Sequence, residues 1–339
     1  MNADWVTSTN QARYRDCYRC VRPCHQKAVR VEIGQEQVVP ERCIACGNCV
    51  TARPQHAKVV GDDTALIQRA LADGQNVVAT VEPLAPAFFD MTSFEQMERV
   101  LRSLGFAAAG ETAYGAQIVG QAHKDWVRHH AESWPVITSS CPVIVNLLER
   151  YYPDLLPNQA PIASPMIVHG RALRRRFGPD AYVVFVGPCC AKEQEIRREA
   201  VAGIVNAALA LDELPDWLQE SNLSFLVCDS EPQCAVRSNA RALAVECGLV
   251  GPAEMDTHFR ASTGITTSGL EACKEVLEAI RRDDLKAESV ELMACEGGCI
   301  SGPGMLSAGS TYLARQRVPE FASRQQPQPL PDRRPWPVD

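Results

Sequence analysis

The chain has no surplus of positive charge. Its 34 lysines and arginines are outnumbered by 41 aspartates and glutamates, so the formal net charge is −7 at pH 7. Nucleic acids and anionic membranes attract basic faces, and this balance argues against either as a partner. No apolar run approaches the roughly 20 residues of a membrane span, and the N-terminus carries no apolar signal segment. We therefore expect a cytoplasmic protein.

Two further features are missing. The seven histidines show no spacing typical of a metal site, and no internal repeat is apparent, which argues against a solenoid. Cysteine, in contrast, is abundant, with 15 in 339 residues. In a chain without a secretion signal, so many cysteines indicate metal binding or redox chemistry rather than a disulfide framework.

The pattern of cysteine and apolar residues changes near Gln75. Residues 1–68 hold six cysteines and few helix-length patterns. Beyond Gln75, apolar patterns predict strands at 75–83, 134–140, 181–188 and 289–295, and helices at 93–106, 143–152 and 268–282. This alternation predicts a largely parallel α/β core within residues 75–318. Residues 319–339 are Pro-rich and polar, which predicts a disordered tail.

Two of the predicted helices begin with the pattern of a capping box. Gln96 follows Ser93 by three residues, and Glu271 follows Ser268 by three. In this motif the serine accepts a backbone N–H of the first helical turn, and the Gln or Glu side chain reaches back to the serine. We therefore expect Ser93 and Ser268 to cap their helices.

The N-terminal cysteines lie in two incomplete runs that resemble the C-x2-C-x2-C-x3-C-P pattern of bacterial ferredoxins. The first run consists of Tyr14, Cys17, Cys20, Cys24 and His25. The second consists of Cys43, Cys46, Cys49, Arg53 and Pro54. Each run has therefore lost one cysteine.

Both losses fall on the same cluster, because the fourth cysteine of each ferredoxin run ligates the cluster of the other run. One cluster would keep only Cys17 and Cys20, and Arg53 would place a permanent cation at one of its ligand positions. The other would keep all four thiolates: Cys24, Cys43, Cys46 and Cys49. We expect residues 1–68 to form an α+β ferredoxin-like domain with one 4Fe–4S cluster.

Two alternatives remain at this stage for the N-terminal cysteines. A zinc ribbon would also suit four thiolates, although the ferredoxin-like spacing disfavours it. Cys17 and Cys20 are then either free thiols or a weak metal or disulfide site.

Three further cysteine segments each follow a predicted strand. They are TSSCP at residues 138–142, GPCCAKEQE at 187–195 and MACEGGCISGPG at 293–304. Proteins with parallel sheets build their sites at such strand ends. Pro142 favours the first position of a helix, so Cys141 should lie at a helix N-terminus, where partial positive charge stabilises a thiolate. The glycines of the third segment allow backbone to approach a bulky inorganic ligand.

In this order and at these separations, the three segments resemble the signature motifs of iron-only (FeFe) hydrogenases. The resemblance covers roughly residues 75 to 312 and implies a two-lobed α/β cluster domain at 75–318. It also implies a 4Fe–4S cluster with four ligands: Cys141, Cys189, Cys295 and Cys299. Cys299 would bridge to a two-iron subcluster that carries CO, cyanide and a dithiolate.

The resemblance also implies roles for side chains around the subcluster. Lys192 would approach a cyanide ligand, and Met166 and Cys190 would line the cofactor pocket. Core packing is the alternative for Met166 and also for Cys190, which lies beside a ligand. It is also the expectation for the cysteines outside the motifs: Cys228, Cys234, Cys247 and Cys273. Glu193 and Glu195 are expected on a solvated helix face.

Ser140 is the main departure from the family pattern. Catalytic members have TSCCP, and the first cysteine of that segment relays protons to the two-iron site; here the residue is Ser140. A thiol with a pKa near 8.5 exchanges protons close to neutral pH, whereas a serine hydroxyl is a poor relay group. The SGPGM ending of the third segment and Ile144 also differ from catalytic members. These departures resemble the sensory branch of the family.

Three functions are compatible with these residues. The favoured one is redox or hydrogen sensing, with electron transfer between a ferredoxin cluster and an H-cluster-like site. The alternatives are a ferredoxin hydrogenase of low turnover, which interconverts H2 with protons and electrons, and a cubane-only electron-transfer or cluster-assembly protein. The expected partners are an electron-transfer protein such as ferredoxin, a separate signalling output protein, and H2 as a ligand.

Overall fold

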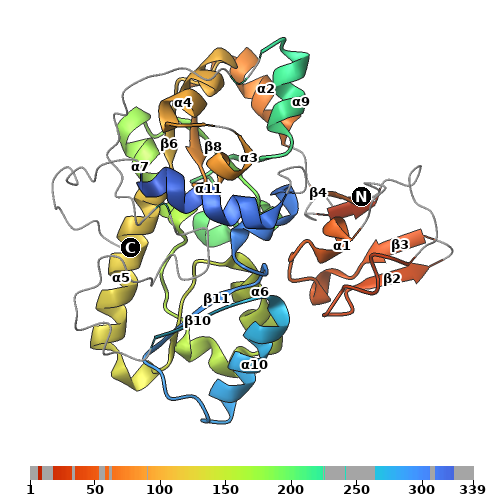
Figure 1. Cartoon of the computed structure of the whole chain (residues 1–339), viewed down its shortest axis with the longest axis vertical. Coiled ribbons are helices and arrows are strands. Elements are labelled where there is room, and N and C mark those ends of the chain that lie inside the picture. Colours follow the sequence, from red (N-terminus) through yellow and green to blue (C-terminus); the bar gives the residue numbers. More distant parts are fainter. Residues whose placement is uncertain are drawn as a thin grey trace.

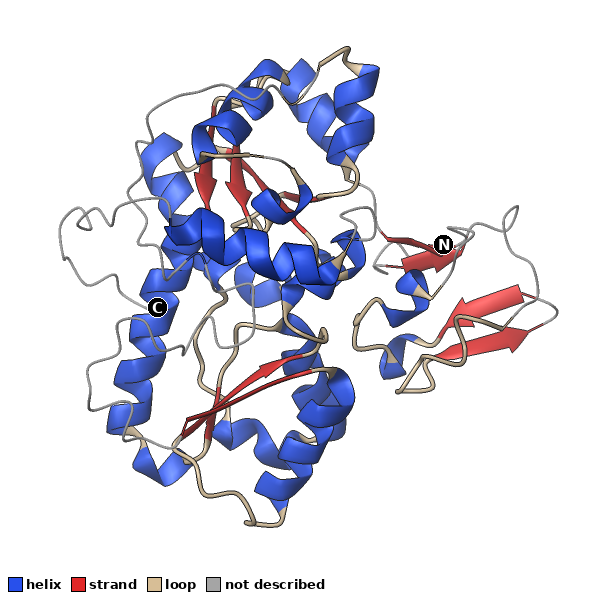
Figure 2. Ribbon diagram, viewed as in Figure 1, coloured by secondary structure: helices blue, strands red, loops and turns tan. Residues whose placement is uncertain are grey.

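The computed structural model describes residues 7–9, 18–32, 35–52, 58–60, 63–89, 91–223, 225, 241, 264–305 and 310–323. These residues form two α/β lobes, one above the other in Figure 1, with a smaller N-terminal unit beside them. Figure 2 shows that each lobe has strands at its centre and helices around them.

The first lobe contains a four-stranded parallel sheet in the order β6-β5-β8-β9. Its strands are β5 (Val77–Val81), β6 (Ala108–Glu111), β8 (Tyr182–Gly187) and β9 (Ala207–Ala210). The central pair β5 and β8 is almost entirely apolar and buried, as expected for a sheet covered on both faces. Its helices are α2 (Thr64–Ala72), α3 (Ala85–Phe88), α4 (Phe94–Ser103), α7 (Pro165–Phe177), α9 (Leu214–Glu220) and α11 (Thr311–Ser323). Two helices contact both lobes: α5 (Ala113–His129) follows β6 and extends along the second lobe (Figure 1), and α8 (Cys190–Glu195) follows β8 and buries Ala191 in the core of the second lobe.

The second lobe contains a three-stranded parallel sheet in the order β10-β11-β7. Its strands are β7 (Val136–Ile137), β10 (Gly264–Ser268) and β11 (Ser289–Met293). Two helices, α6 (Pro142–Tyr151) and α10 (Leu270–Arg281), pack their apolar faces into one core with these strands. The two parallel sheets confirm the predicted α/β core.

The N-terminal unit is built from two antiparallel strand pairs and one short helix. β1 (Thr7–Thr9) pairs with β4 (Lys58–Val60), and β2 (Val29–Glu32) pairs with β3 (Gln35–Val38). The helix α1 (Asn48–Thr51) carries Cys49. Among the described helices of the whole chain, none is long and apolar enough to cross a membrane.

One of the two predicted helix caps is confirmed and the other is wrong. Ser93 and Gln96 form the expected capping box at the start of α4. Ser268, in contrast, pairs with Met293 as the last residue of β10, and α10 begins only at Leu270. The intervening Gly269 has a φ of +92°, a conformation that turns the chain from strand into helix.

The prediction of a disordered tail from residue 319 is wrong for its first five residues. Helix α11 continues through Pro319 to Ser323. Val318 and Phe321 are 1% and 5% exposed in the core of the first lobe, so apolar burial holds the helix despite the proline. Residues 324–339 lie outside the described part of the chain.

Helices α5 and α7 approach each other closely at Gly115. A Cβ atom built on Gly115 would lie 2.1 Å from the carbonyl oxygen of Pro165, which is backbone and cannot rotate away. Pro165 is the first residue of α7 and lines the cavity described below. The glycine therefore sets the distance between α5 and one wall of that cavity.

We expect Gly115→Ala to destabilise the protein by about 2–3 kcal/mol, because the two helices must separate to admit the methyl group. This cost exceeds the gain of about 1 kcal/mol in helix propensity. Thermal unfolding should show it as a fall in the midpoint of several degrees. Gly264→Ala is the matched control, since its Cβ would meet Ser289 Oγ at an ordinary 3.4 Å. An unchanged midpoint in Gly115→Ala would contradict this description of the packing.

Candidate iron–sulfur site between the lobes

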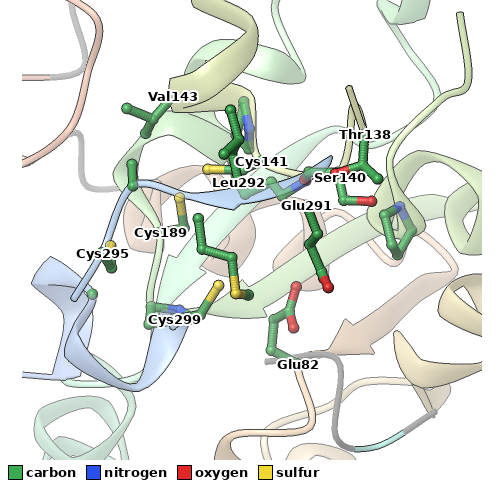
Figure 3. Close-up of a pocket in the computed structure, with 17 residues that line it drawn as sticks. Glu82, Thr138, Ser140, Cys141, Val143, Cys189, Glu291, Leu292, Cys295 and Cys299 are labelled. Atoms are coloured by element: carbon green, nitrogen blue, oxygen red, sulfur yellow. The ribbon is translucent and has the colours of Figure 1, made fainter. Parts of the chain in front are cut away.

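A cavity of about 50 Å³ lies where the strands of the two lobes end. Four cysteines from the three sequence segments line it: Cys141, Cys189, Cys295 and Cys299. Figure 3 shows these side chains around one space, with Glu82 and Glu291 on another part of its wall. The structure thus brings together residues that are up to 158 positions apart (141 to 299) in the sequence.

Two of these cysteines occupy the same local position in their segments. Cys141 is the N-cap of α6, with Pro142 at the first helical position, and Cys189 is the N-cap of α8. Each follows a buried parallel strand, β7 or β8. The expected helix N-terminus at Cys141 is therefore present, and its backbone dipoles favour negative charge at the sulfur.

The glycines of the third segment shape the loop that carries Cys295 and Cys299. Gly297 and Gly298 have φ angles of +77° and +98°, which side-chain-bearing residues rarely adopt. Gly304 approaches the backbone of Pro188, where an added Cβ would lie 3.0 Å from its Cα, and its N–H donates to the Pro188 carbonyl at 2.8 Å. Because it has no side chain, Gly304 lets the segment 293–304 pack directly against the segment 187–195.

The thiols of this site lie in a poorly solvated environment. Desolvation, reinforced by the neighbouring Cys141, raises the pKa of Cys189 to about 12. It also raises the pKa values of Cys295 and Cys299 well above their ordinary value, and other thiols nearby add to the shift. Thiolates here therefore require positive charge beside them, and the iron atoms of an iron–sulfur cluster would supply it.

Lys192 supplies a buried positive charge in the cavity wall, and its side chain is 7% exposed. Its Nζ lies 2.8 Å from Glu195 Oε2 and 3.5 Å from the carbonyl oxygen of Ser140. Burial alone would lower the pKa of Lys192, but Glu195, Cys189 and Glu82 outweigh it and raise the pKa. A permanent cation beside four thiols suits an anionic cluster.

Glu193 and Glu195 are not on a solvated helix face, so that expectation is wrong. Glu193 is 3% exposed, and the Glu195 side chain is 13% exposed in its ion pair with Lys192. Helix α8 has only one turn and a half, and it lies between the two lobes. Both of its faces are therefore covered.

Ser140 lines the cavity, and its hydroxyl is shielded from solvent. Among the described residues its Oγ has no hydrogen-bond partner. The preceding Ser139 behaves differently, because its hydroxyl donates to the Ile162 carbonyl at 2.5 Å and its N–H to His123 Nε2 at 3.3 Å. Ser139 is thus fixed in the protein, while Ser140 presents an unsatisfied hydroxyl to the cavity.

Two carboxylic acids in the cavity wall were not anticipated from the sequence. Glu82 directly follows β5, and Glu291 lies within β11; both are buried and point into the cavity in Figure 3. Burial raises the pKa of Glu82 to about 7, and nearby Glu195 adds to the shift while Lys192 opposes it. Glu82 can therefore exchange a proton near neutral pH. Its place at a strand end was the available signal.

Met166 and Cys190 do not line this cavity, contrary to the prediction. Met166 is fully buried in a separate core cluster with Phe185, and its neighbour Pro165 is the residue that faces the cavity. The Cys190 thiol points toward the N-terminal unit and donates to the Ala45 carbonyl at 3.2 Å. In both cases the preceding residue, Pro165 or Cys189, faces the cavity, and the residue after it points in another direction.

A second group of cysteines gathers in the N-terminal unit. Cys24 is buried, and Cys43 and Cys49 pack beside it. Desolvation raises the pKa of Cys46 to about 11, and Cys43 and Cys24 contribute to the shift. The four predicted ligands of the ferredoxin-like cluster are therefore close together. The Cys20 thiol has a different partner, because it donates to Glu36 Oε2 at 2.5 Å.

Several predicted features fall outside the described residues. They are Tyr14, Cys17, Arg53, Cys228, Cys234 and Cys247. In the part of the chain that is described, no three His, Cys, Asp or Glu side chains are close enough to hold a single metal ion.

Residues 75–303 match the family described as iron only hydrogenase large subunit, C-terminal domain. This match spans most of the chain, and with the convergent cysteines it shows that the protein belongs to this family. The fold agrees: a HydA1 [FeFe]-hydrogenase from Chlamydomonas reinhardtii superposes with a TM-score of 0.62 at 16% identity, covering 77% of this chain and 88% of that one.

Sequence relatives include proteins with two kinds of name. The periplasmic [Fe] hydrogenase large subunit of Nitratidesulfovibrio vulgaris is 26% identical over an alignment of 270 positions, and the match covers 63% of this chain and 64% of that protein. The cytosolic Fe-S cluster assembly factor NAR1 of Eremothecium gossypii is 24% identical over an alignment of 362 positions, which covers 84% of this chain and 78% of that protein. The chain spans about half to two thirds of the length of the hydrogenases that it matches.

Proposed function

We propose that this protein is a hydrogenase-like redox or hydrogen sensor. Cys24, Cys43, Cys46 and Cys49 would hold a ferredoxin-type 4Fe–4S cluster. The four cavity cysteines would hold a second one, with Cys299 bridging to a two-iron subcluster. When bound, these groups supply one-electron transfer and hydrogen binding. The partners would be an electron-transfer protein such as ferredoxin and a separate output protein.

The observation that carries this proposal is the unpartnered hydroxyl of Ser140 in the wall of an otherwise complete site. The four thiols and the buried Lys192 suit the metal centre, but the residue at the relay position is a weak acid that does not titrate near neutral pH. A sensor needs hydrogen to occupy the site and change its state. It does not need rapid turnover.

A cubane-only electron-transfer or cluster-assembly protein is the second candidate. The similarity to the NAR1 assembly factor favours it, because the match covers more of both chains than the match to the periplasmic hydrogenase. Such a protein would use the same cysteines for cubane clusters and would leave the cavity beside Ser140 without a two-iron subcluster.

Infrared spectroscopy separates these functions. The full-length protein would be incubated with a synthetic two-iron precursor and freed of excess reagent. We expect CO and cyanide bands that shift when hydrogen is added, and we expect Lys192→Met to shift the cyanide bands because it removes the buried cation. A protein that shows no such bands, although its cubane clusters are intact, would support the assembly or electron-transfer function.

A further inference from the structure

The loop of residues 40–45, which leads to Cys46, is bound by side chains of helices α6 and α8. Arg150 Nη1 donates to the carbonyls of Pro40, at 2.6 Å, and of Cys43. Tyr151 donates its hydroxyl to the Arg42 carbonyl at 2.8 Å. The two remaining donors are Asn146, to Ile44 at 3.1 Å, and Cys190, to Ala45 at 3.2 Å. Five carbonyls within six residues are thus bound by side chains from elsewhere in the chain.

Apolar burial fixes the same loop. Ile44 is 1% exposed and packs into the core of the second lobe with Ile137 and Ile144. Gly47 has a φ of +76°, and a Cβ there would lie 2.7 Å from Pro303 Cγ and 3.1 Å from Cys190 Sγ. The loop therefore docks against the cluster segments themselves rather than against a distant surface.

The donors of this contact are rigid. Asn146 is 2% exposed, and its amide is oriented by Arg198, which donates to Oδ1 at 2.6 Å, and by Gln194, whose Oε1 accepts at 2.9 Å. Asn146 also lies on α6, the helix that Cys141 caps. One helix thus carries a ligand of the cavity cluster at its start and holds the loop of the N-terminal cluster along its side.

Cys190 completes a bonded connection between the two cysteine groups. It is the residue after Cys189, and its thiol donates to the carbonyl of Ala45, the residue before Cys46. One peptide unit, one hydrogen bond and one further peptide unit therefore separate a ligand of one cluster from a ligand of the other.

We infer that the Cys190–Ala45 hydrogen bond and the Asn146 contact form the electron-transfer junction between the two clusters. This inference rests on the proposed function, because it needs a cluster at each end. With a cluster held at each site, this contact would carry one electron from a reduced N-terminal cluster to an oxidised cavity cluster, and no bond would be made or broken. Cys190 acts as a positioning residue, since it holds the two ligand loops in contact but ligates neither cluster.

The test compares Cys190→Ala with Cys273→Ala in full-length protein that holds both cubanes. Cys273 is the matched control, because it is also fully buried and its thiol donates to a carbonyl, that of Met293, at 3.4 Å. After reduction with dithionite, electron paramagnetic resonance should show loss of the magnetic coupling between the two clusters in Cys190→Ala. It should show wild-type coupling in Cys273→Ala.

Hydrogen exchange gives a second measurement that does not depend on activity. Cys190→Ala leaves a buried carbonyl unsatisfied, so amides in residues 43–49 should exchange roughly fivefold faster or more, while those of β5 and β8 should not change. Cys190→Ser, which keeps a donor, should recover part of the protection. Asn146→Asp is an independent variant. It keeps the shape of the side chain but removes the amide that donates to the Ile44 carbonyl.

The outcomes separate the junction from the proposed function. Wild-type protein with about four irons instead of about eight would overturn both, and iron analysis alone would reveal it. With both cubanes present, wild-type coupling and exchange in both Cys190→Ala and Asn146→Asp would overturn the junction alone. A similar loss of coupling in Cys273→Ala would also overturn it, because the effect would then come from any buried thiol.

Discussion

Replacing Cys299 with alanine should lower the iron content from about eight to about four atoms per chain in protein produced without two-iron maturation, because the cavity cubane is lost. Desolvation raises the pKa of Cys299 and of its neighbours Cys189 and Cys295 well above the ordinary value. With one ligand missing, three such thiolates are expected to release the cluster. Iron and sulfide analysis, with the visible absorption spectrum, measures the loss.

A second variant, Cys46→Ala, tests the cysteine group of the N-terminal unit. Cys46→Ala should also remove about four irons, this time from the N-terminal unit, and combining it with Cys299→Ala should remove nearly all of the iron. Cys273→Ala is the control, since Cys273 is fully buried in α10 and lines neither group. About twelve irons in the wild type would contradict the single N-terminal cluster, and an unchanged iron content in Cys299→Ala would contradict the site in the cavity.

The cavity cysteines were predictable because their signals are local. Each of the three segments couples a buried strand to a cysteine at its carboxyl end, and Pro142 marks the helix that Cys141 caps. Parallel strands in a sheet end on the same side, so the topology alone brings such residues together. The separation of the strands into two sheets does not disturb this, because both sheets end at the same cavity.

Side-chain direction was less predictable. Cys189 and Cys190 are adjacent, yet one faces the cavity and the other faces Ala45, because successive residues at a helix start point in different directions. The same change of direction separates Pro165 from Met166. A motif predicts that a segment lies at a site. Which of two adjacent side chains faces the site depends on the exact residue at which the helix begins.

The roles of Glu82 and Glu195 required the tertiary structure. The place of Glu82 at a strand end was a local signal, but Glu82 becomes a cavity residue because β5 pairs with β8, whose end precedes Cys189. The raised pKa of Glu82 results from that long-range pairing, whereas the ion pair between Glu195 and Lys192 is local to α8 and becomes buried only in the tertiary structure. Charged residues at the ends of predicted parallel strands therefore merit the same scrutiny as cysteines.

Ser140→Cys should raise hydrogen evolution by about tenfold or more in protein loaded with the two-iron subcluster, without changing its iron content. A positioned proton-transfer group typically contributes roughly 10²–10⁴-fold in rate. The Ser140 side chain lines the cavity, and its Oγ has no partner among the described residues, so a thiol at the same Cβ needs to displace no existing hydrogen bond. Evolution from an artificial reduced donor, measured by gas chromatography, gives the rate.

The control is Ser140→Ala, which changes the size of the side chain but adds no group that titrates near neutral pH. It should leave the low wild-type rate and the infrared bands unchanged. The gain in Ser140→Cys should also depend on pH: because desolvation raises the pKa of thiols in this cavity, the gain should still be increasing as the pH rises past the ordinary thiol pKa of about 8.5. The gain need not reach the rate of a dedicated enzyme, because Glu82 occupies the wall beyond the cysteines and alters the surroundings of the site. If fully loaded wild-type protein already evolves hydrogen rapidly, or if Ser140→Cys and Ser140→Ala behave alike, the protein is better described as a hydrogenase with another proton route than as a sensor.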